Sequence, residues 1–138
     1  MITERELKKK SVQYRRDILR VIKERGAGHT GGDLSSIDIL NVLYNRVLRV
    51  TPENFGNSDR DYYIQSKGHC AEALFVVLAD RGFFPKEELK TLNKFGSHFI
   101  GHPTRKVNGV EQNTGALGHG LAFAVGVALA AKQDCNDF

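Results

Sequence analysis

The chain has 138 residues, enough for a single domain with one packed core. Its 41% apolar residues, 26% charged residues, 14 glycines and 3 prolines exclude collagen-like, low-complexity and disordered proteins, and its longest run without a polar residue, 121–131, is too short to cross a membrane. The formal net charge is +4, and the excess comes from residues 1–25, which carry nine basic and four acidic side chains.

The first predicted element is a helix over residues 3–25, where apolar side chains recur every three, four or seven positions until Gly26. Its basic residues predict a solvated helix face rather than a nucleic-acid surface, since no nucleic-acid-binding motif accompanies them. A second helix, capped by Asp33 or Ser35, should run to about residue 49. Apolar residues cover most of its circumference, so we expect it to be largely buried.

The remaining chain alternates between short elements and loops. Aromatic residues at 61–65 predict a strand, and the Ala- and Leu-rich sequence at 70–81 predicts a helix. A proline-led short helix is expected over 86–93, and scattered glycines leave 95–114 as a long loop. The last predicted helix covers 117–133, and its many small residues would permit close packing against a neighbour.

Three segments combine glycines with a histidine where an element begins or ends: 28–32, 66–69 and 115–120. Glycine lets a backbone approach a ligand closely, and the free N–H groups of a helix N-terminus favour an anion. Each segment alone could simply form a turn, but the three together predict a phosphate-bearing ligand. None has the glycine spacing of a P-loop or of a dinucleotide-binding fold, which leaves ATP and NAD poorly supported.

Two other constellations have simpler interpretations. His98 and His102 have the spacing of zinc ligands on a helix, but Gly101 and Pro103 disfavour a helix there. Cys70 follows a histidine, yet it begins an apolar helix and lacks a third partner, which favours a buried thiol over a nucleophile. The two cysteines lie far apart, and the first ten residues lack the apolar region of a signal peptide. We therefore expect a reducing, cytoplasmic compartment.

Long blocks of the sequence resemble transketolase, a thiamine diphosphate enzyme. They are GAGHTGGDLSSIDILNVLY, RDYYIQSKGHCAEALFVVLADRGFF and GHPTRKVNGVEQNTGALGHGLAFAVGVALAAK, and the similarity covers about 7–132. The resemblance implies an α/β fold, with a parallel sheet flanked by helices, in which residues 1–138 form the N-terminal part of the diphosphate-binding domain. The implied reaction transfers a two-carbon ketol unit from a ketose phosphate to an aldose phosphate, in the pentose phosphate pathway of carbohydrate metabolism.

The resemblance also assigns roles to individual residues. His69 would contact the diphosphate, and the backbone of Gly115, Ala116 and Leu117 would line the cofactor. His29 and His102 would act as catalytic residues facing the sugar, because imidazoles can donate and accept hydrogen bonds and move protons.

The sequence departs from the family at Thr30, where proline is usual, at His98, where arginine is common, and at His119, where glutamine is usual. The family holds Mg²⁺ with a Gly-Asp-Gly motif and a later asparagine, and the sequence reaches Phe138 without them. We therefore expect no metal ligands in this chain.

Alone, the chain should be inactive. Its expected partners are sugar phosphates and a companion C-terminal subunit, in a homo-oligomer such as a dimer or in a heterotetramer, with neither nucleic acid nor membrane. The alternative is a catalytically inactive interaction module. In either case, the apolar last helix is expected to promote self-association.

Overall fold

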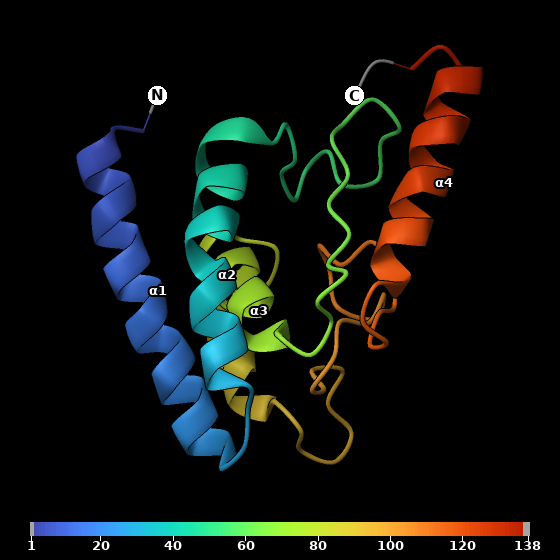
Figure 1. Ribbon diagram of the computed structural model, residues 1–138. Helices are drawn as coiled ribbons and strands as arrows, with labels where there is room; N and C mark the ends of the chain where they lie inside the picture. Colours follow the sequence, from blue (N-terminus) through green and yellow to red (C-terminus); the bar gives the residue numbers. More distant parts are fainter. Residues whose placement is uncertain (1, 137–138) are drawn as a thin grey trace.

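A computed structural model describes residues 2–136, in which helices are joined by long irregular segments (Figure 1). The elements are α1 (Glu4–Arg25), α2 (Thr30–Val42), the π-helical turn η1 (Leu43–Val47), α3 (Ala71–Asp80), the 3-10 helix η2 (Lys86–Thr91) and α4 (His119–Gln133). The helices predicted from the sequence are all present. The second one, however, ends in η1, and the short one after Pro85 is a 3-10 helix.

The parallel sheet implied by the resemblance is absent from residues 2–136, so the expected α/β fold class is wrong for this structure. The residues of the predicted strand, 61–65, instead form an irregular segment without a ladder of backbone hydrogen bonds (Figure 1). A strand needs a second extended segment beside it to pair its backbone groups, and no other part of the described chain provides one. Side-chain packing holds the segment in place, with the Tyr63 ring 5.5 Å from that of Tyr44.

Both ends of α1 are specified by local sequence. Thr3 accepts a hydrogen bond from the Glu6 backbone N–H, and the Glu6 carboxylate accepts one from the Thr3 N–H, which forms a capping box. Gly26 ends the helix with a φ of 76°, a left-handed conformation that glycine adopts at little cost. These signals explain why the predicted and observed boundaries of α1 nearly coincide.

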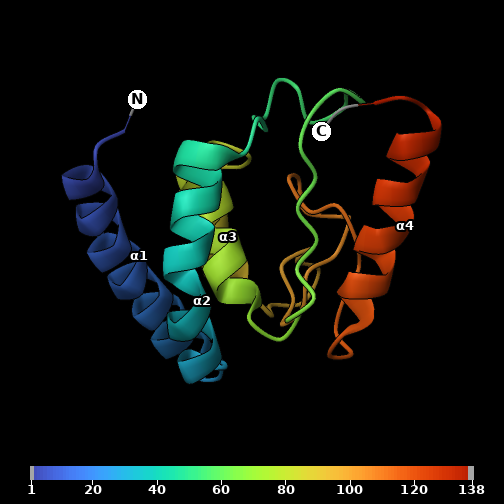
Figure 2. The ribbon, with the colours of Figure 1, turned by 45° about the horizontal axis from the view of Figure 1, so that its top comes forward.

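The core lies where α1 and α2 run side by side with α3 behind them (Figures 1 and 2). All residues from 71 to 79 are buried, so α3 is the central helix. The largest fully buried core side chains include Tyr14, Ile18, Ile37, Leu40, Phe75 and Leu78. Because α2 begins beside His29 and α3 begins just after His69, this packing fixes the relative positions of two Gly-His segments.

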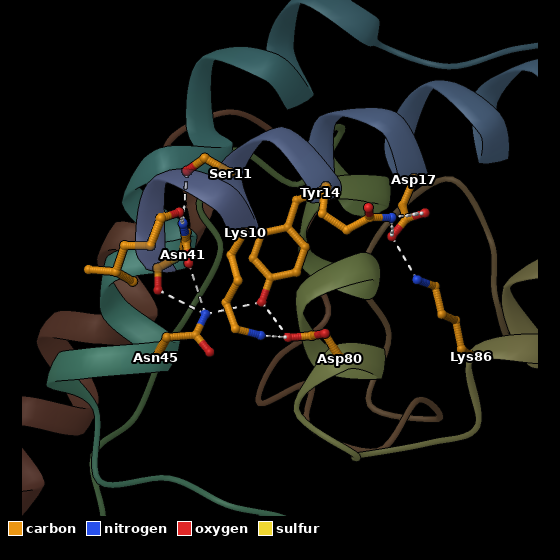
Figure 3. Close-up of polar contacts among 10 residues, drawn as sticks. Lys10, Ser11, Tyr14, Asp17, Asn41, Asn45, Asp80 and Lys86 are labelled. Carbon is orange, nitrogen blue, oxygen red and sulfur yellow. Dashed lines mark hydrogen bonds and ion pairs between the residues drawn. The ribbon is translucent and has the colours of Figure 1, made fainter. Parts of the chain in front are cut away.

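Polar contacts also tie these helices together (Figure 3). The Tyr14 hydroxyl donates to Asp80 Oδ2 at 2.6 Å and accepts from Asn45 Nδ2 at 3.0 Å. Lys86 Nζ lies 2.7 Å from Asp17 Oδ2, which joins η2 to α1. The three-helix core is thus held by specific hydrogen bonds as well as by apolar packing.

Many basic side chains of α1 pair with carboxylates of the same chain. The pairs are Lys8–Glu4, Lys10–Asp80, Arg15–Asp38, Arg20–Asp17 and Arg25–Glu72. These contacts match part of the positive charge of α1 within the molecule, and the solvated helix face stays a prediction.

α4 stands apart from the other helices, across the irregular segments (Figures 1 and 2). Leu121, Val125 and Leu129 follow one another every four residues and are 66%, 51% and 59% exposed, which forms an apolar stripe. On another side of α4, a cavity of about 480 Å³ lies between residues such as Val127 and the irregular segment that contains Ile64. No helix within residues 2–136 combines the length and apolar character of a membrane span.

Candidate functional site

The three Gly-His segments lie at the N-terminal ends of three helices. His29 is the cap residue of α2, the 66–69 segment directly precedes Cys70, the cap residue of α3, and Gly118 caps α4. Figure 1 shows that α2 and α4 begin at the same end of the molecule. The first N–H groups of a helix lack intrahelical partners, so each of these ends is favourable for negative charge.

These segments also touch one another. The rings of His29 and His69 lie 4.9 Å apart between centroids, in an edge-to-face arrangement. A Cβ atom placed on Gly68 would lie 2.7 Å from the backbone nitrogen of Gly115, which shows direct backbone contact. One placed on Gly120 would lie 2.6 Å from the Cα of Ser66. The structure therefore brings the 28–32, 66–69 and 115–120 segments to one place.

His102 belongs to the same group. A Cβ atom on Gly115 would lie 3.4 Å from His102 Cδ2, so the imidazole rests against the glycine backbone. The positive charge of His102 also acts on His69. His29 and His102 are both exposed, which leaves them open to a ligand.

The other two histidines are placed differently. His98 lines a separate cavity of about 340 Å³ together with Thr104 and Arg105. His119 begins α4, and its ring lies 5.1 Å from that of Phe123. Among residues 2–136, no group of three or more His, Cys, Asp or Glu side chains is arranged to hold a metal ion.

The electrostatic environment of His69 favours its neutral form. Desolvation and the positive charges of His29, Lys67 and His102 lower the pKa of His69 below its usual value of 6.5. At neutral pH the imidazole therefore offers one hydrogen-bond donor and one hydrogen-bond acceptor. An anion bound beside it would work against these causes and raise the pKa.

Lys67 is a member of this cluster that the sequence interpretation missed. Its Nζ donates to the Gly32 carbonyl at 3.1 Å and to Ser35 Oγ at 2.8 Å, which joins the 66–69 segment to α2. A signal was present, because the lysine stands inside the SKGH motif. The glycine and the histidine of that motif predicted a ligand, and the lysine between Ser66 and Gly68 completes the same segment.

Two residues near the cluster have structural positions. Asp33, predicted as a cap, is instead buried in the first turn of α2, where its Oδ1 accepts from the Ala73 N–H at 3.0 Å. Cys70 is fully buried, and desolvation raises the pKa of its thiol. A thiol in this state is a poor nucleophile, which agrees with the prediction of an inert cysteine.

The arrangement suits a phosphorylated organic ligand. Three helix N-termini, the imidazoles and the Lys67 ammonium can receive negative charge. Glycine backbone at Gly68 and Gly115 leaves room for close approach, and Leu117, 73% exposed, offers apolar surface beside it.

Comparisons with known proteins agree on one family. The family model described as transketolase, thiamine diphosphate binding domain, matches residues 7–138. An apulose-4-phosphate transketolase subunit of Phocaeicola vulgatus is 46% identical over 132 residues, which cover 96% of this chain and 47% of that protein. The 6-deoxy-6-sulfo-D-fructose transketolase subunit of Clostridium sp. (strain MSTE9) is 43% identical over 117 residues, which cover 84% of this chain and 42% of that protein.

A solved structure agrees as well. A transketolase from Leishmania mexicana superposes with a TM-score of 0.82 at 30% identity, covering 94% of this chain and 19% of that one. The chain thus spans about half the length of the curated subunits that it matches, or slightly less. Since the family model covers nearly all of the sequence, the chain belongs to the transketolase family.

Proposed function

We propose that this chain forms the N-terminal part of the diphosphate-binding domain of a transketolase that transfers a two-carbon ketol unit from a ketose phosphate to an aldose phosphate. The observation that carries the proposal is the meeting of three Gly-His segments at three helix N-termini, in a chain of the transketolase family. When bound, thiamine diphosphate supplies an electron sink for the carbanion produced by carbon–carbon cleavage.

In this proposal, His69 and the backbone of Gly115, Ala116 and Leu117 hold the cofactor. The neutral His69 imidazole donates an N–H to a phosphate oxygen, and the N-terminus of α4 directs its dipole to the same negative charge. The glycine surface supports this assignment, because a side chain on Gly68 would collide with the backbone of Gly115.

His29 and His102 are proposed as the catalytic residues that face the sugar. Both are exposed, and both lie beside groups assigned to the cofactor, His29 against His69 and His102 against Gly115. Each imidazole can orient a sugar hydroxyl and accept or return its proton.

The proposal also includes Mg²⁺, a cytoplasmic location and a companion subunit. Within residues 2–136, no group of three or more His, Cys, Asp or Glu side chains is arranged to hold a metal ion. Mg²⁺ would therefore take its ligands outside these residues. A companion C-terminal subunit, in a dimeric or heterotetrameric assembly, is supported by the relatives named as subunits. The cytoplasmic location is supported by Cys70 and Cys135, which are both free thiols.

The test is reconstitution with the remaining transketolase sequence and the companion subunit, thiamine diphosphate and Mg²⁺, followed by ketol transfer from a phosphorylated ketose. His29→Ala and His102→Ala should each lower kcat/KM by about 10²–10⁴-fold, the usual contribution of a positioned proton donor or acceptor. Lys9→Ala, on the exposed face of α1, is the control and should keep wild-type activity. Wild-type activity in both histidine variants would contradict their assignment.

The apolar stripe of α4 favours a second candidate, a catalytically inactive interaction module. Calorimetry with thiamine diphosphate and Mg²⁺ on the reconstituted assembly separates the two. Saturable cofactor binding that His69→Ala abolishes supports the transketolase. A companion subunit captured by this chain without any cofactor binding in the complex supports the interaction module.

A further inference from the structure

Three charged side chains meet in the interior close to the histidine cluster, and the proposed reaction uses none of them. Arg25 is the last residue of α1, Asp33 lies in the first turn of α2, and Glu72 lies in the first turn of α3. Asp33 and Glu72 are 0% exposed, and the Arg25 side chain is 11% exposed. Buried charges are costly, so their arrangement calls for a physical explanation.

The contacts of these groups are incomplete. Arg25 Nη1 donates to Glu72 Oε1, and Asp33 Oδ1 accepts from the Ala73 N–H. The second oxygen of each carboxyl group, Asp33 Oδ2 and Glu72 Oε2, is buried without a hydrogen-bond partner among the described residues. Two buried acceptors and one buried donor, Arg25 Nε, thus lie in neighbouring side chains without partners among the described residues.

Charge balance supplies the missing donor. Two ionised carboxylates against one guanidinium would leave one uncompensated negative charge in the interior, which burial strongly disfavours. Burial raises the pKa of Asp33 to about 7, and the negative charge and hydrogen bond of Glu72 act in the same direction. The Ala73 N–H and Lys67 oppose the shift without cancelling it.

The cluster also touches the groups around the proposed site. Glu72 acts electrostatically on His69, and Cys70, the cap residue of α3, directly follows His69. Asp33, which lies four residues after His29, accepts a hydrogen bond from the backbone of α3 and so joins α2 to α3. A Cβ atom on Gly101, the neighbour of His102, would lie 2.7 Å from Arg25 Nη2.

We propose that Asp33 and Glu72 share one proton and, together with Arg25, form a neutral positioning triad that holds the N-terminal turns of α2 and α3 in place, and with them His29 and His69. Its significance for catalysis rests on the proposed function, but the triad itself does not. The charged and titratable groups that act on Asp33 are Lys67, Cys70 and Glu72, and those that act on Glu72 also include Arg25 from α1 and His69 from the segment before α3.

The first test is infrared spectroscopy of the protein at about pH 6, where free carboxyl groups are almost fully ionised. The wild type should show the carbonyl band of a buried protonated carboxyl group, and Asp33→Asn should lack it. Glu72→Gln should shift the band, because it removes the negative charge and the hydrogen bond that Glu72 directs at Asp33. Glu24→Gln, which removes an exposed carboxylate at the end of α1, should keep it. A band that survives in Asp33→Asn, or is absent from the wild type, overturns the shared proton.

The second test reads the histidines by NMR. Asp33→Asn preserves a neutral group of nearly the same shape, so the resonances and pKa of His69 should match those of wild type and Glu24→Gln. Arg25→Met and Glu72→Gln should displace the resonances of both His29 and His69. The spectrum of Asp33→Asn, which should remain that of the folded protein, is the reference for both variants. Displaced histidine resonances in Asp33→Asn, or unchanged ones in Glu72→Gln, overturn the positioning role. Neither test requires cofactor or turnover, so failure of the triad and failure of the proposed function are distinguishable.

Discussion

His69 is the residue where the proposed diphosphate contact can be measured directly, because its pKa is held below 6.5 by desolvation and by neighbouring positive charges. A bound diphosphate would compensate those charges. Adding thiamine diphosphate and Mg²⁺ to the reconstituted assembly should therefore raise the pKa of His69, as an opposite charge at short range does. Histidine titration by NMR measures the shift, and His98, which lines a separate cavity, is the internal control. A saturated complex in which the pKa of His69 does not rise would refute the contact.

Asp33 predicts an unusual dependence of stability on pH. Its pKa is raised from 3.8 to about 7 in the folded state, so the folded chain retains a proton that the unfolded chain releases between those values. The resulting stabilisation is fully present below pH 3.8 and is lost as the pH rises to about 7. Urea unfolding should therefore show that Asp33→Asn gains stability relative to wild type across this window.

A second aspartate provides the control of opposite sign. Hydrogen bonds from Arg15 and Ser11 lower the pKa of the exposed Asp38 to about 2. Its stabilisation is present above pH 3.8 and is lost as the pH falls toward 2, so Asp38→Asn should be destabilised relative to wild type above that window. A difference between Asp33→Asn and wild type that does not change from pH 4 to 7 would contradict the raised pKa of Asp33.

The junction between α3 and α4 depends on close backbone contact at Gly68. A Cβ atom there would lie 2.7 Å from Gly115 N and 2.8 Å from the Thr114 carbonyl carbon, and backbone cannot yield as a flexible side chain can. Gly68→Ala should cost about 1–3 kcal/mol of unfolding free energy, as overpacking usually does, and should weaken binding of thiamine diphosphate in the reconstituted assembly. Denaturant unfolding and calorimetry measure the two effects.

Gly31 offers a matched control for this substitution. It lies in α2, and a Cβ atom on it would meet nothing within 4 Å. Because alanine is a better helix former than glycine, Gly31→Ala should be neutral or stabilise the protein by up to about 1 kcal/mol. Equal stability changes in the two variants would show that the Gly68 contact is not what joins the segments.

The helices could be predicted from sequence, whereas the expected sheet is absent from residues 2–136, for a physical reason. The ends of α1 are set by local signals, the Thr3 capping box and Gly26, which act within a few residues. The aromatic residues at 61–65 have strand propensity, but a strand exists only with a partner alongside, and none lies in the described chain. The wrong fold class followed from the resemblance, which implied a parallel sheet, whereas the local propensity at 61–65 predicted only a single strand.

The histidines of the candidate site could be predicted from the sequence, but the buried charged residues beneath them could not. Three Gly-His segments in one sequence indicated a shared ligand, and the structure brings them together. The roles of these residues in cofactor and sugar binding stay predictions. The Arg25–Glu72 ion pair joins residues 47 positions apart, and no pattern in the sequence links them. Asp33 also resembles an ordinary helix cap until its burial against α3 is known.

The molecule leaves the stripe of Leu121, Val125 and Leu129 uncovered on α4, and this surface predicts concentration-dependent self-association. Fully burying one such side chain contributes about 1.5–3 kcal/mol, so three in a row can hold two chains together weakly. Sedimentation velocity should show the wild type associating as its concentration rises, and Leu121→Lys with Leu129→Lys should shift it to monomer.

The matched control for the stripe is Val12→Lys with Leu19→Lys. This pair adds the same charge at apolar positions of α1 that are 52% and 47% exposed, and it should leave association unchanged. If both double variants dissociate the protein equally, added charge rather than the α4 stripe governs association. If the wild type sediments as a monomer at every concentration, the stripe does not join copies of this chain, and a companion subunit becomes the occupant to test, by adding it to the wild type and to the α4 variant in parallel.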